Sequence, residues 1–405
     1  MRRLTIKNIG PLSSVDISLS RINLIIGPQS TGKSCILKIA SFCAWLEEHL
    51  EFSQNPDGEF TDTVIDNKLI NFYRLKDFIK EGSYFEYETD ALRFSYSFDD
   101  KRKDFEWKEG RWEYRRRKTA YIIAERNIVA AVPNWFEVNF ENDCLKAFLA
   151  DWQNARNFMK GFGSIDVLEQ NIAYQYDEVK QEDQIVINKG QALNLRNASS
   201  GLQSVVPLFI QLFYFSYGFF LNLKKGKIID EMSHEEILNE LSKAFDSDVS
   251  KSGEGYIVKE KAIKIIDQLT QYDSCDFFIE EPEENLFPET QYDLVNWLAE
   301  LLNGERKHSL FIATHSPYIM SAFNNLIQAG DIIEDSPEKR AEVEEIIGGN
   351  RAINYDDVAA FAISDGRVHS IKDDELRLIS PSELDTASDN ISNVFNQLLY
   401  RVEGH

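Results

Sequence analysis

The chain has 405 residues, enough for one large domain or two to three ordinary ones, and 43% of them are hydrophobic. That apolar share supports a packed core and excludes a disordered chain. Lysine and arginine number 44 against 67 aspartates and glutamates, so the formal net charge is −23. This balance argues against nonspecific wrapping of nucleic acid, although it leaves room for a local basic patch.

The four cysteines, Cys35, Cys43, Cys144 and Cys275, form no CxxC pair. Their spacing argues against a zinc site and a disulfide framework and indicates reduced thiols. The N-terminal "MRRLTIKNIGPLSS" has two arginines but no uninterrupted apolar stretch after them, so it is a poor signal peptide. We therefore expect a cytoplasmic protein.

The first 26 residues predict β structure that leads into a helix. Residues 15–19 alternate between apolar and polar, and "INLIIG" (22–27) is a short apolar run typical of a strand buried on both faces. Residues 32–50 then place Ile36, Ile39 and Cys43 on one helical face.

Between this strand and this helix lies a phosphate-binding motif of the form G-x-x-x-x-G-K-[ST]. Its residues are Gly27, Pro28, Gln29, Ser30, Thr31, Gly32, Lys33 and Ser34. Glycines let backbone N–H groups curl around phosphate oxygens, and the helix N-terminus adds partial positive charge. Lys33 can reach the β- and γ-phosphates, and the Ser34 hydroxyl can bind Mg²⁺. Accidental matches to the bare pattern are common, but the strand before it and the helix after it predict a nucleoside triphosphate site.

The middle of the chain predicts several smaller elements. Residues 51–118 alternate aromatic and charged side chains, which favours antiparallel hairpins. Residues 119–127 predict a core strand, 141–181 mixed helix and loop, and 183–195 a hairpin. The basic run "RWEYRRRK" (111–118) is interpreted as a solvated hairpin edge, with a phosphate, DNA or acidic-partner contact as the alternative.

An apolar helix is predicted over residues 204–223, directly after "NASSGLQS" (197–204). Its length fits a membrane span, but Pro207, Gln211 and Gly218 interrupt it, so we expect a buried core helix and no membrane association. The Ser-Gly pair before it could cap the helix or offer hydroxyl and N–H donors to an anion.

The remaining chain alternates helices and strands. Helices are predicted at 233–245 and 258–269, followed by a strand at 276–281, a helix at 288–303, a strand at 308–315 and a helix at 317–323. Such alternation indicates a mostly parallel sheet covered by helices. The acidic residues 334–346 predict a solvated helix, and residues 363–385 predict hairpin strands before a final helix.

A doubled carboxylate, Glu280-Glu281, ends the apolar strand "DFFI". A phosphate-binding loop needs an acidic group at the end of a neighbouring strand to hold Mg²⁺ and position water. Two adjacent carboxylates are tolerable beside a divalent cation. We therefore expect Glu280 to face the metal and Glu281 to polarise the attacking water, with a charged turn as the alternative.

The ordered set of phosphate loop, Ser-Gly-x-Gln helix start, "EEPEENLFP" and "LFIATHSP" resembles the ABC-type ATPases, and more narrowly their SMC-like and OLD-like branch. It is also similar to the ATPase subunits of PARIS- and Septu-type anti-phage systems. The resemblance covers about residues 1–50, 195–225 and 275–325. It is weak over 51–190 and 226–274.

The resemblance implies roles for residues at matching positions. Glu281 matches the catalytic glutamate and His315 the switch histidine, while Ser34 and Glu280 match the Mg²⁺ site. The resemblance further assigns residues to a signature that closes over the γ-phosphate of the opposite protomer: Ser200, Gly201 and Gln203. Residues 286–288 lie in the loop that crosses the dimer interface.

Three departures from the family pattern stand out. Glu280 replaces the usual aspartate, as in many OLD-like members, and Leu202 replaces the second glycine of the signature. No clear glutamine of the linking loop is present, and Glu125-Arg126 fall in the corresponding region with an undefined role.

The expected fold is α/β: a P-loop ABC-type ATPase head with a mostly parallel core sheet (1–50, 119–225 and 275–405), an antiparallel β insert (51–118) and a helical insert (226–274). The expected function is hydrolysis of ATP with Mg²⁺ by a homodimer or higher homo-oligomer. The resemblance implies a sensor or scaffold switch that controls a separately encoded nuclease or toxin in anti-phage defence, with a phage protein as trigger. A DNA repair ATPase and a transporter subunit are the alternatives, and nucleic-acid binding stays open.

Overall fold

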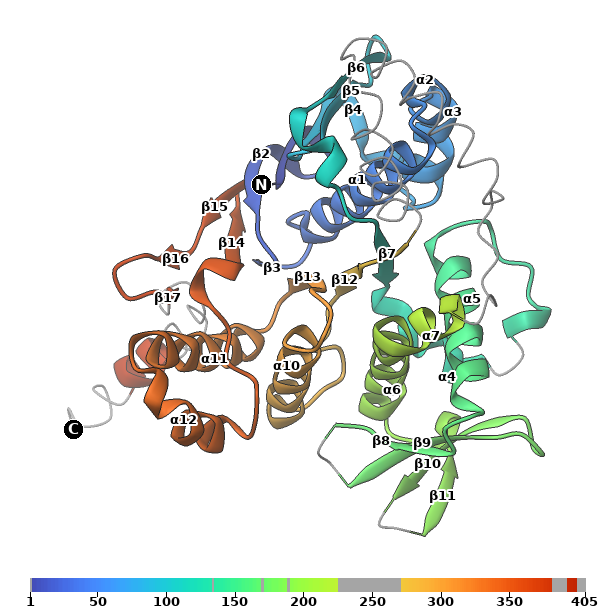
Figure 1. Cartoon of the computed structure of the whole chain (residues 1–405), viewed down its shortest axis with the longest axis vertical. Coiled ribbons are helices and arrows are strands. Elements are labelled where there is room, and N and C mark those ends of the chain that lie inside the picture. The colour runs from blue at the N-terminus through green and yellow to red at the C-terminus, as the bar shows by residue number, and fades with distance from the viewer. Residues whose placement is uncertain are drawn as a thin grey trace, which may run out of the picture.

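The computed structural model describes residues 2–132, 135–168, 171–187, 190–224, 271–380 and 392–398. Within them an 11-stranded sheet has the order β6-β5-β4-β1-β2-β15-β14-β3-β13-β12-β7 (Figure 1). The helices predicted at 233–245 and 258–269 lie outside the described residues, as does nearly all of the predicted helical insert.

The half of the sheet that carries the phosphate loop is parallel. It consists of β14 (Val358–Ser364), β3 (Ile22–Ile26), β13 (Ser309–Thr314), β12 (Ser274–Glu280) and β7 (Arg117–Ile122). Every residue of β3, β12 and β13 is buried, as their continuous apolar runs predict. The predicted parallel core is confirmed, and the carboxyl ends of these strands meet at one edge.

The other half of the sheet is mainly antiparallel. Strands β2 (Leu12–Leu19), β1 (Arg2–Ile9), β4 (Ile79–Glu88), β5 (Leu92–Ser97) and β6 (Arg102–Trp107) pair in succession. Strand β15 (Arg367–Ser370) joins the halves, because it pairs antiparallel with β14 and parallel with β2. The predicted hairpins therefore exist over 79–107, and they extend the main sheet.

Residues 56–78, also predicted as hairpin, are helical instead. They form α2 (Pro56–Glu59), α3 (Asp62–Val64), a π-helical turn (Ile65–Asn71) and a 3₁₀ turn (Lys76–Phe78). The Asn55 side chain accepts a hydrogen bond from Gly58 N–H, and the Thr61 side chain accepts one from Val64 N–H. These N-caps start short helices where aromatic alternation alone indicated strands.

Helix α1 (Lys33–Ser53) lies between the two halves of the sheet (Figure 1). It contacts β7, β12 and β13 on one side. On the other side Phe42 packs edge-on against Phe85 of β4, and Glu47 accepts a hydrogen bond from Tyr87 Oη at 3.0 Å. Because protein surrounds α1, 17 of its 21 residues are buried. The phosphate loop is thus anchored to a helix that the core holds on all sides.

Helices α10 (Pro288–Leu302) and α11 (Pro317–Asp335) cover the opposite face of the parallel half (Figure 1). Each connects one parallel strand to the next. Helix α11 continues well beyond its predicted end at residue 323, and only α12 (Arg340–Ile347) remains of the acidic helix predicted over 334–346.

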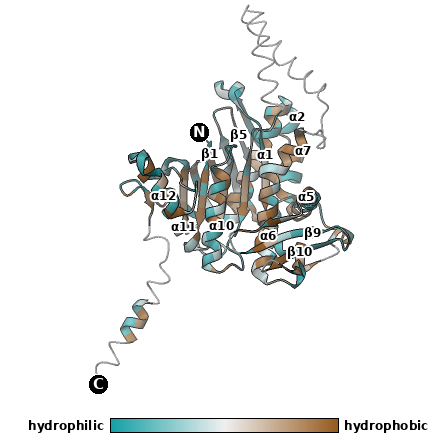
Figure 2. Cartoon of the chain, turned by 60° about the horizontal axis from the view of Figure 1, so that its bottom comes forward, coloured by the Kyte–Doolittle hydropathy of each residue, from teal (hydrophilic) through white to brown (hydrophobic). Residues whose placement is uncertain are grey.

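The apolar segment after residue 200 forms α6 (Ser200–Phe213), a π-helical turn (Tyr214–Gly218) and α7 (Phe219–Lys224). Among the described residues, one helix, Ser200–Leu223, is long and apolar enough to cross a membrane, and 83% of its apolar window is buried in the protein. In Figure 2 the hydrophobic residues gather on the central strands and the helices beside them. The segment is the buried core helix that its polar interruptions predict.

Helix α5 (Cys144–Met159) packs on α6, beside a separate antiparallel sheet. This sheet has the order β11 (Gln191–Asn194), β10 (Glu182–Ile187), β9 (Ile172–Asp177), β8 (Ser164–Asp166). The hairpin predicted at 183–195 is confirmed, whereas β8 and β9 lie where mixed helix and loop were predicted.

The prediction that the basic run 111–118 is a solvated edge is wrong for two of its arginines, Arg116 and Arg117, whereas the Arg115 side chain is 62% exposed. Arg116 is 4% exposed, forms an ion pair with Glu48 at 3.2 Å, and stacks on aromatic rings. Arg117 opens β7 and is also engaged inside the protein. Burial with a carboxylate partner removes Arg116 from the surface that a nucleic acid or an acidic partner could contact, and the Arg117 side chain is 16% exposed beside Asp276.

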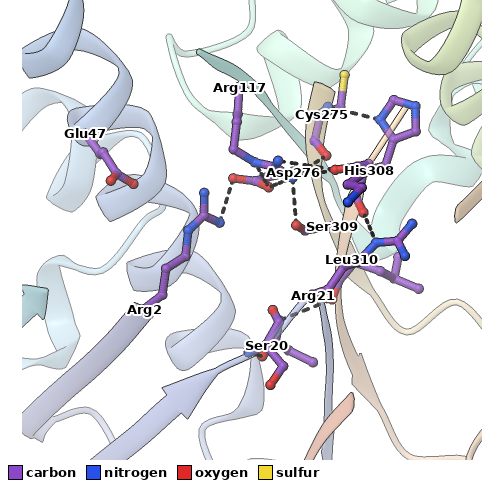
Figure 3. A network of polar contacts seen from close by, with 12 residues as sticks. Arg2, Ser20, Arg21, Glu47, Arg117, Cys275, Asp276, His308, Ser309 and Leu310 are labelled. Carbon is purple, nitrogen blue, oxygen red and sulfur yellow. Dashed lines mark hydrogen bonds and ion pairs between the residues drawn. The ribbon is translucent and has the colours of Figure 1, made fainter. Parts of the chain in front are cut away.

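Arg117 belongs to a polar network at the amino ends of the parallel strands (Figure 3). Asp276 is 1% exposed and accepts from Arg117 Nε at 2.6 Å and from Arg2 Nη1 at 2.9 Å. Arg117 also donates to Ser309 Oγ, and His308 Nδ1 accepts from the backbone N–H of Cys275. Burial alone would raise the pKa of Asp276, but the two arginines hold it at about 2. The network joins β1, β7, β12 and β13 at the end opposite the phosphate loop.

Candidate functional site

The phosphate loop adopts the backbone conformation that its glycines permit. Gly32 has φ 105° at the N-cap of α1, and a Cβ there would lie 2.7 Å from Leu12 Cδ2. Ser30 is also left-handed, with φ 62°. No side chain caps the start of α1, so its first N–H groups face the loop. The residues beside the loop line a cavity of about 500 Å³, which includes Gln29, Ser30, Gly32, Lys33 and Ser34.

Lys33 is nearly buried, and its ammonium group has three acceptors. Nζ donates to Gly27 O at 2.7 Å, to Pro28 O at 2.8 Å and to His315 Nδ1 at 3.1 Å. Burial lowers the pKa of Lys33 to about 8, although Glu281 opposes the shift. Because an ammonium has three protons, a phosphate oxygen that binds Lys33 must replace one of these acceptors.

His315 connects Lys33 to the predicted catalytic carboxylate. Since Nδ1 accepts from Lys33, Nε2 carries the proton and donates to Glu281 Oε1 at 3.2 Å. The backbone N–H of His315 donates to Glu283 Oε1 at 2.5 Å. The ends of β3, β13 and β12 are neighbours in the sheet, so the parallel topology brings these groups together.

Glu281 has an unusual backbone for a residue with a side chain. Its φ is 43°, in the left-handed region, and its N–H donates to Ala313 O on β13 at 2.8 Å. This conformation turns the chain at the end of β12 and directs the carboxylate into the cavity that Lys33 and His315 also line.

Glu280 is 6% exposed and faces a different set of groups. Oε1 accepts from Tyr121 Oη at 2.7 Å, Oε2 accepts from Ala124 N–H at 3.3 Å, and Lys38 Nζ lies 4.0 Å from Oε1. Glu280 therefore has a tyrosine, a backbone amide and a cation as partners, and its metal role stays a prediction.

The donor chemistry of the site fits Mg²⁺. Ser34 lines the cavity beside Lys33, and Lys38, one helical turn later, lies close to Glu280. Hydroxyl and carboxylate oxygens are ligands that Mg²⁺ accepts, usually with waters and substrate phosphates completing the shell. No group of three or more His, Cys, Asp or Glu residues that could hold a metal occurs within the described part of the chain. A metal here would therefore depend on oxygen ligands from the nucleotide.

The predicted signature residues do not line this cavity. Ser199 caps α6, and its side chain accepts from Leu202 N–H, so Ser200 is the first helical residue. A Cβ on Gly201 would lie 2.9 Å from Asn285 O, which shows how closely α6 packs against the loop after β12. Gln203 Nε2 donates to two carbonyls in residues 196–198. The structure thus brings the phosphate loop, Glu281 and His315 together, and the residues predicted as a signature lie outside their cavity.

Arg126 is fully buried beneath the turn that carries Glu281. Nη1 donates to Glu280 O at 2.9 Å, Nη2 donates to Glu281 O at 2.7 Å, and Nε donates to Ser204 O at 3.0 Å. Burial lowers the pKa of Arg126, and glutamates around it, of which Glu284 acts most strongly, oppose the shift. The sequence singled out Arg126 without a role, and its partners lie about 80 and 155 residues away.

Two family models of ATPase domains match the chain. Residues 22–217 match the model described as "AAA domain, putative AbiEii toxin, Type IV TA system". Residues 139–320 match the model described as "AAA ATPase domain". Each match covers less than half of the chain, and together they include the phosphate loop, β12 and His315. The chain is an ATPase.

Several solved structures are weakly similar to this chain. The SMC head domain from Thermotoga maritima is 10% identical, with 91% of this chain and 97% of that chain covered and a TM-score of 0.37. The recombination mediator protein RecF is 11% identical, with 91% and 97% covered and a TM-score of 0.29. A dimeric bacterial ABC transporter cassette is 10% identical, with 90% and 96% covered and a TM-score of 0.27. Comparison with curated proteins gives no match.

Proposed function

We propose that this ATPase belongs to the SMC-like and OLD-like branch of ABC-type proteins and works as a nucleotide-dependent switch. One observation carries the proposal: Lys33, His315 and Glu281 form a continuous hydrogen-bonded chain at the ends of three adjacent parallel strands. This arrangement puts a phosphate-binding cation and a carboxylate base on opposite sides of one histidine.

The chemistry follows from these contacts. When phosphate oxygens accept hydrogen bonds from Lys33, the hydrogen bond from Lys33 to His315 Nδ1 is lost. His315 is then free to move together with Glu281. Glu281 then accepts a proton from the attacking water, as a general base within reach of the cavity. Ser34 and Glu280 would hold Mg²⁺, which neutralises charge on the phosphates when it is bound.

Two copies of the chain would complete the site. Ser200 and Gly201 lie outside their own phosphate-loop cavity, and Phe287, in the loop beside them, is 73% exposed. We therefore propose that the signature of one copy binds the nucleotide held by the other.

The switch would control a separately encoded nuclease or toxin in anti-phage defence. The description of the first family names a toxin of a type IV toxin–antitoxin system, which supports this biological setting. The effector and a phage trigger protein are proposed partners. A nuclease or toxin gene beside this one, whose product co-purifies only with the nucleotide-bound protein, is the expected finding; a permease gene would instead favour transport.

The central test is the variant Glu281→Gln, which keeps the shape of the side chain and removes the base. We expect nucleotide binding within about twofold of wild type and a fall in kcat of about 10²–10⁴, the usual contribution of a general base. Trapped nucleotide should also increase the dimer fraction in light scattering. Lys33→Ala should weaken nucleotide binding strongly.

The matched control is Glu289→Gln, an exposed glutamate in the first turn of α10. It makes the same chemical change near the same turn and should keep wild-type turnover. Wild-type turnover in Glu281→Gln would refute the assigned base.

A further inference from the structure

Arg126 makes a set of contacts that the proposed function does not use. Its guanidinium group is completely buried and donates to backbone carbonyls on two separate elements. On one side are Glu280 O, Glu281 O and, at 3.3 Å, Pro282 O. On the other side is Ser204 O in the first turn of α6. Arg126 also donates within its own turn to Ile123 O at 3.4 Å.

The first group of contacts fixes the backbone of the predicted catalytic residue. Glu281 occupies the left-handed region, which a residue with a Cβ adopts only when its surroundings hold it there. Arg126 binds the carbonyl of Glu281 itself and those of the residues before and after it. The direction of the Glu281 carboxylate toward His315 therefore depends on these hydrogen bonds.

The second contact ties the same guanidinium to the signature helix. Ser204 lies one turn after Gly201 on α6, and its Oγ accepts from Asn285 Nδ2 at 3.0 Å. The close approach of Gly201 to Asn285 O adds a steric contact between the same two elements. The start of α6, the loop after β12 and the turn at Glu281 are thus connected by hydrogen bonds, with Arg126 between them.

We propose that Arg126 is a positioning residue that transmits the position of the signature helix to Glu281. When Ser200 and Gly201 engage the nucleotide of a second copy, a shift of α6 moves Ser204 O, and Arg126 passes this shift to the backbone of Glu281. Each copy would thereby align its own base only when it is bound to its partner. This inference rests on the proposed function, because it uses the two-copy site.

The test variant is Arg126→Lys. Lysine keeps a positive charge among the surrounding glutamates, but a single ammonium cannot span carbonyls on two elements as a planar guanidinium does. We expect kcat for ATP to fall by about tenfold or more, because several hydrogen bonds that orient Glu281 are lost. Binding of a non-hydrolysable ATP analogue should change by no more than about twofold, since Lys33 and the phosphate loop make no contact with Arg126.

The matched control is Arg351→Lys, a buried arginine that pairs with Glu300 at 2.7 Å beside α12. This variant should keep kcat within about twofold of wild type, because it makes the same chemical change away from the site. A loss of kcat in Arg126→Lys with unchanged analogue binding and unchanged dimerisation supports the coupling. Unchanged kcat in a folded Arg126→Lys, or parallel losses of kcat and analogue binding, would overturn it.

A second variant keeps the proposal testable if Arg126→Lys does not fold. Ser204→Ala keeps the backbone carbonyl that accepts from Arg126 and removes the hydroxyl that accepts from Asn285, which is the other polar contact between the start of α6 and the loop after β12. We expect kcat to fall by about threefold to fivefold with analogue binding unchanged, and an unchanged kcat would overturn the coupling. If wild-type protein fails to hydrolyse ATP, the proposed function itself fails, and that result is separate from these comparisons.

Discussion

Raising the pH from 7 to 9 should weaken nucleotide binding through Lys33. Burial lowers the pKa of this lysine to about 8 in the protein, against an ordinary value of 10.5. The free protein therefore carries the cation in about nine-tenths of molecules at pH 7 and in about one-tenth at pH 9. Bound phosphates favour the charged form and raise its pKa, so a proton must be taken up when nucleotide binds at the higher pH.

The expected magnitude follows from that proton uptake. If the pKa of Lys33 in the complex is 10 or above, the apparent Kd rises about tenfold between pH 7 and pH 9, which corresponds to about 1.4 kcal/mol of binding free energy. Below pH 7 the titration of Lys33 should no longer change the Kd, because its amine is then almost fully protonated.

Equilibrium titration with a fluorescent, non-hydrolysable ATP analogue measures this effect directly. Lys33→Met provides the control, because it removes the titrating group and leaves the rest of the cavity. The Kd of this variant should be higher than that of wild type and should change by no more than about twofold over the same pH range. A wild-type Kd that stays constant from pH 7 to pH 9, or a variant Kd that rises in parallel with it, would refute the reasoning.

Three substitutions and one control variant test other parts of the structure. Asp276→Asn should lower the free energy of unfolding by about 3–5 kcal/mol at pH 7, because Arg2 and Arg117 lose their anion. The pKa of Asp276 is lowered to about 2 in the folded protein, so its stabilisation is present above about pH 4 and is lost toward pH 2. Denaturant curves of the two proteins should therefore converge near pH 2. Gly201→Ala should lower kcat by about tenfold with the fold retained, because its Cβ would lie 2.9 Å from Asn285 O; wild-type kcat would contradict the close packing. Phe278→Ala should lower the free energy of unfolding by about 3–5 kcal/mol, because the fully buried ring stacks on a neighbouring strand, whereas Phe287→Ala, on an exposed loop, should change it by no more than about 0.5 kcal/mol.

Local patterns predict the edge of the sheet at which the phosphate loop, Glu281 and His315 lie together. The run at 22–27 predicted a buried strand, and the glycines and Lys33 after it predicted the phosphate loop. The apolar runs before Glu280 and His315 likewise predicted two further buried strands. Since parallel strands share one carboxyl edge, the three segments had to lie near one another once they were neighbours. The apolar runs and the phosphate-loop motif can each be recognised within a short segment of the sequence.

Partners that are distant in the chain could not be predicted in this way. Strand β14 pairs with β3, and their paired residues Val358 and Ile22 are 358 − 22 = 336 positions apart. Residues 358–363 are an apolar run, but a run of this kind does not say which strand it pairs with. Arg116 and Arg117 looked like surface charges because burial of an arginine depends on a carboxylate from another segment. The role of Arg126 could not be predicted, since its distant hydrogen-bond acceptors are backbone carbonyls, which every residue has, and the Glu284 carboxylate lies 3.9 Å away on another segment.

The partners of strand β3 are synthesised long after β3 itself. Strand β3, which leads into the phosphate loop, pairs with β13 and β14, and Ile22 is opposite Leu310. The separation is 310 − 22 = 288 residues. At a synthesis rate of about 5–20 residues per second, the ribosome needs about 15–60 seconds to make the partner of this strand. Until then β3 cannot take its place in the sheet, so a chain that terminates before β13 contains the phosphate loop but not the strands that hold it.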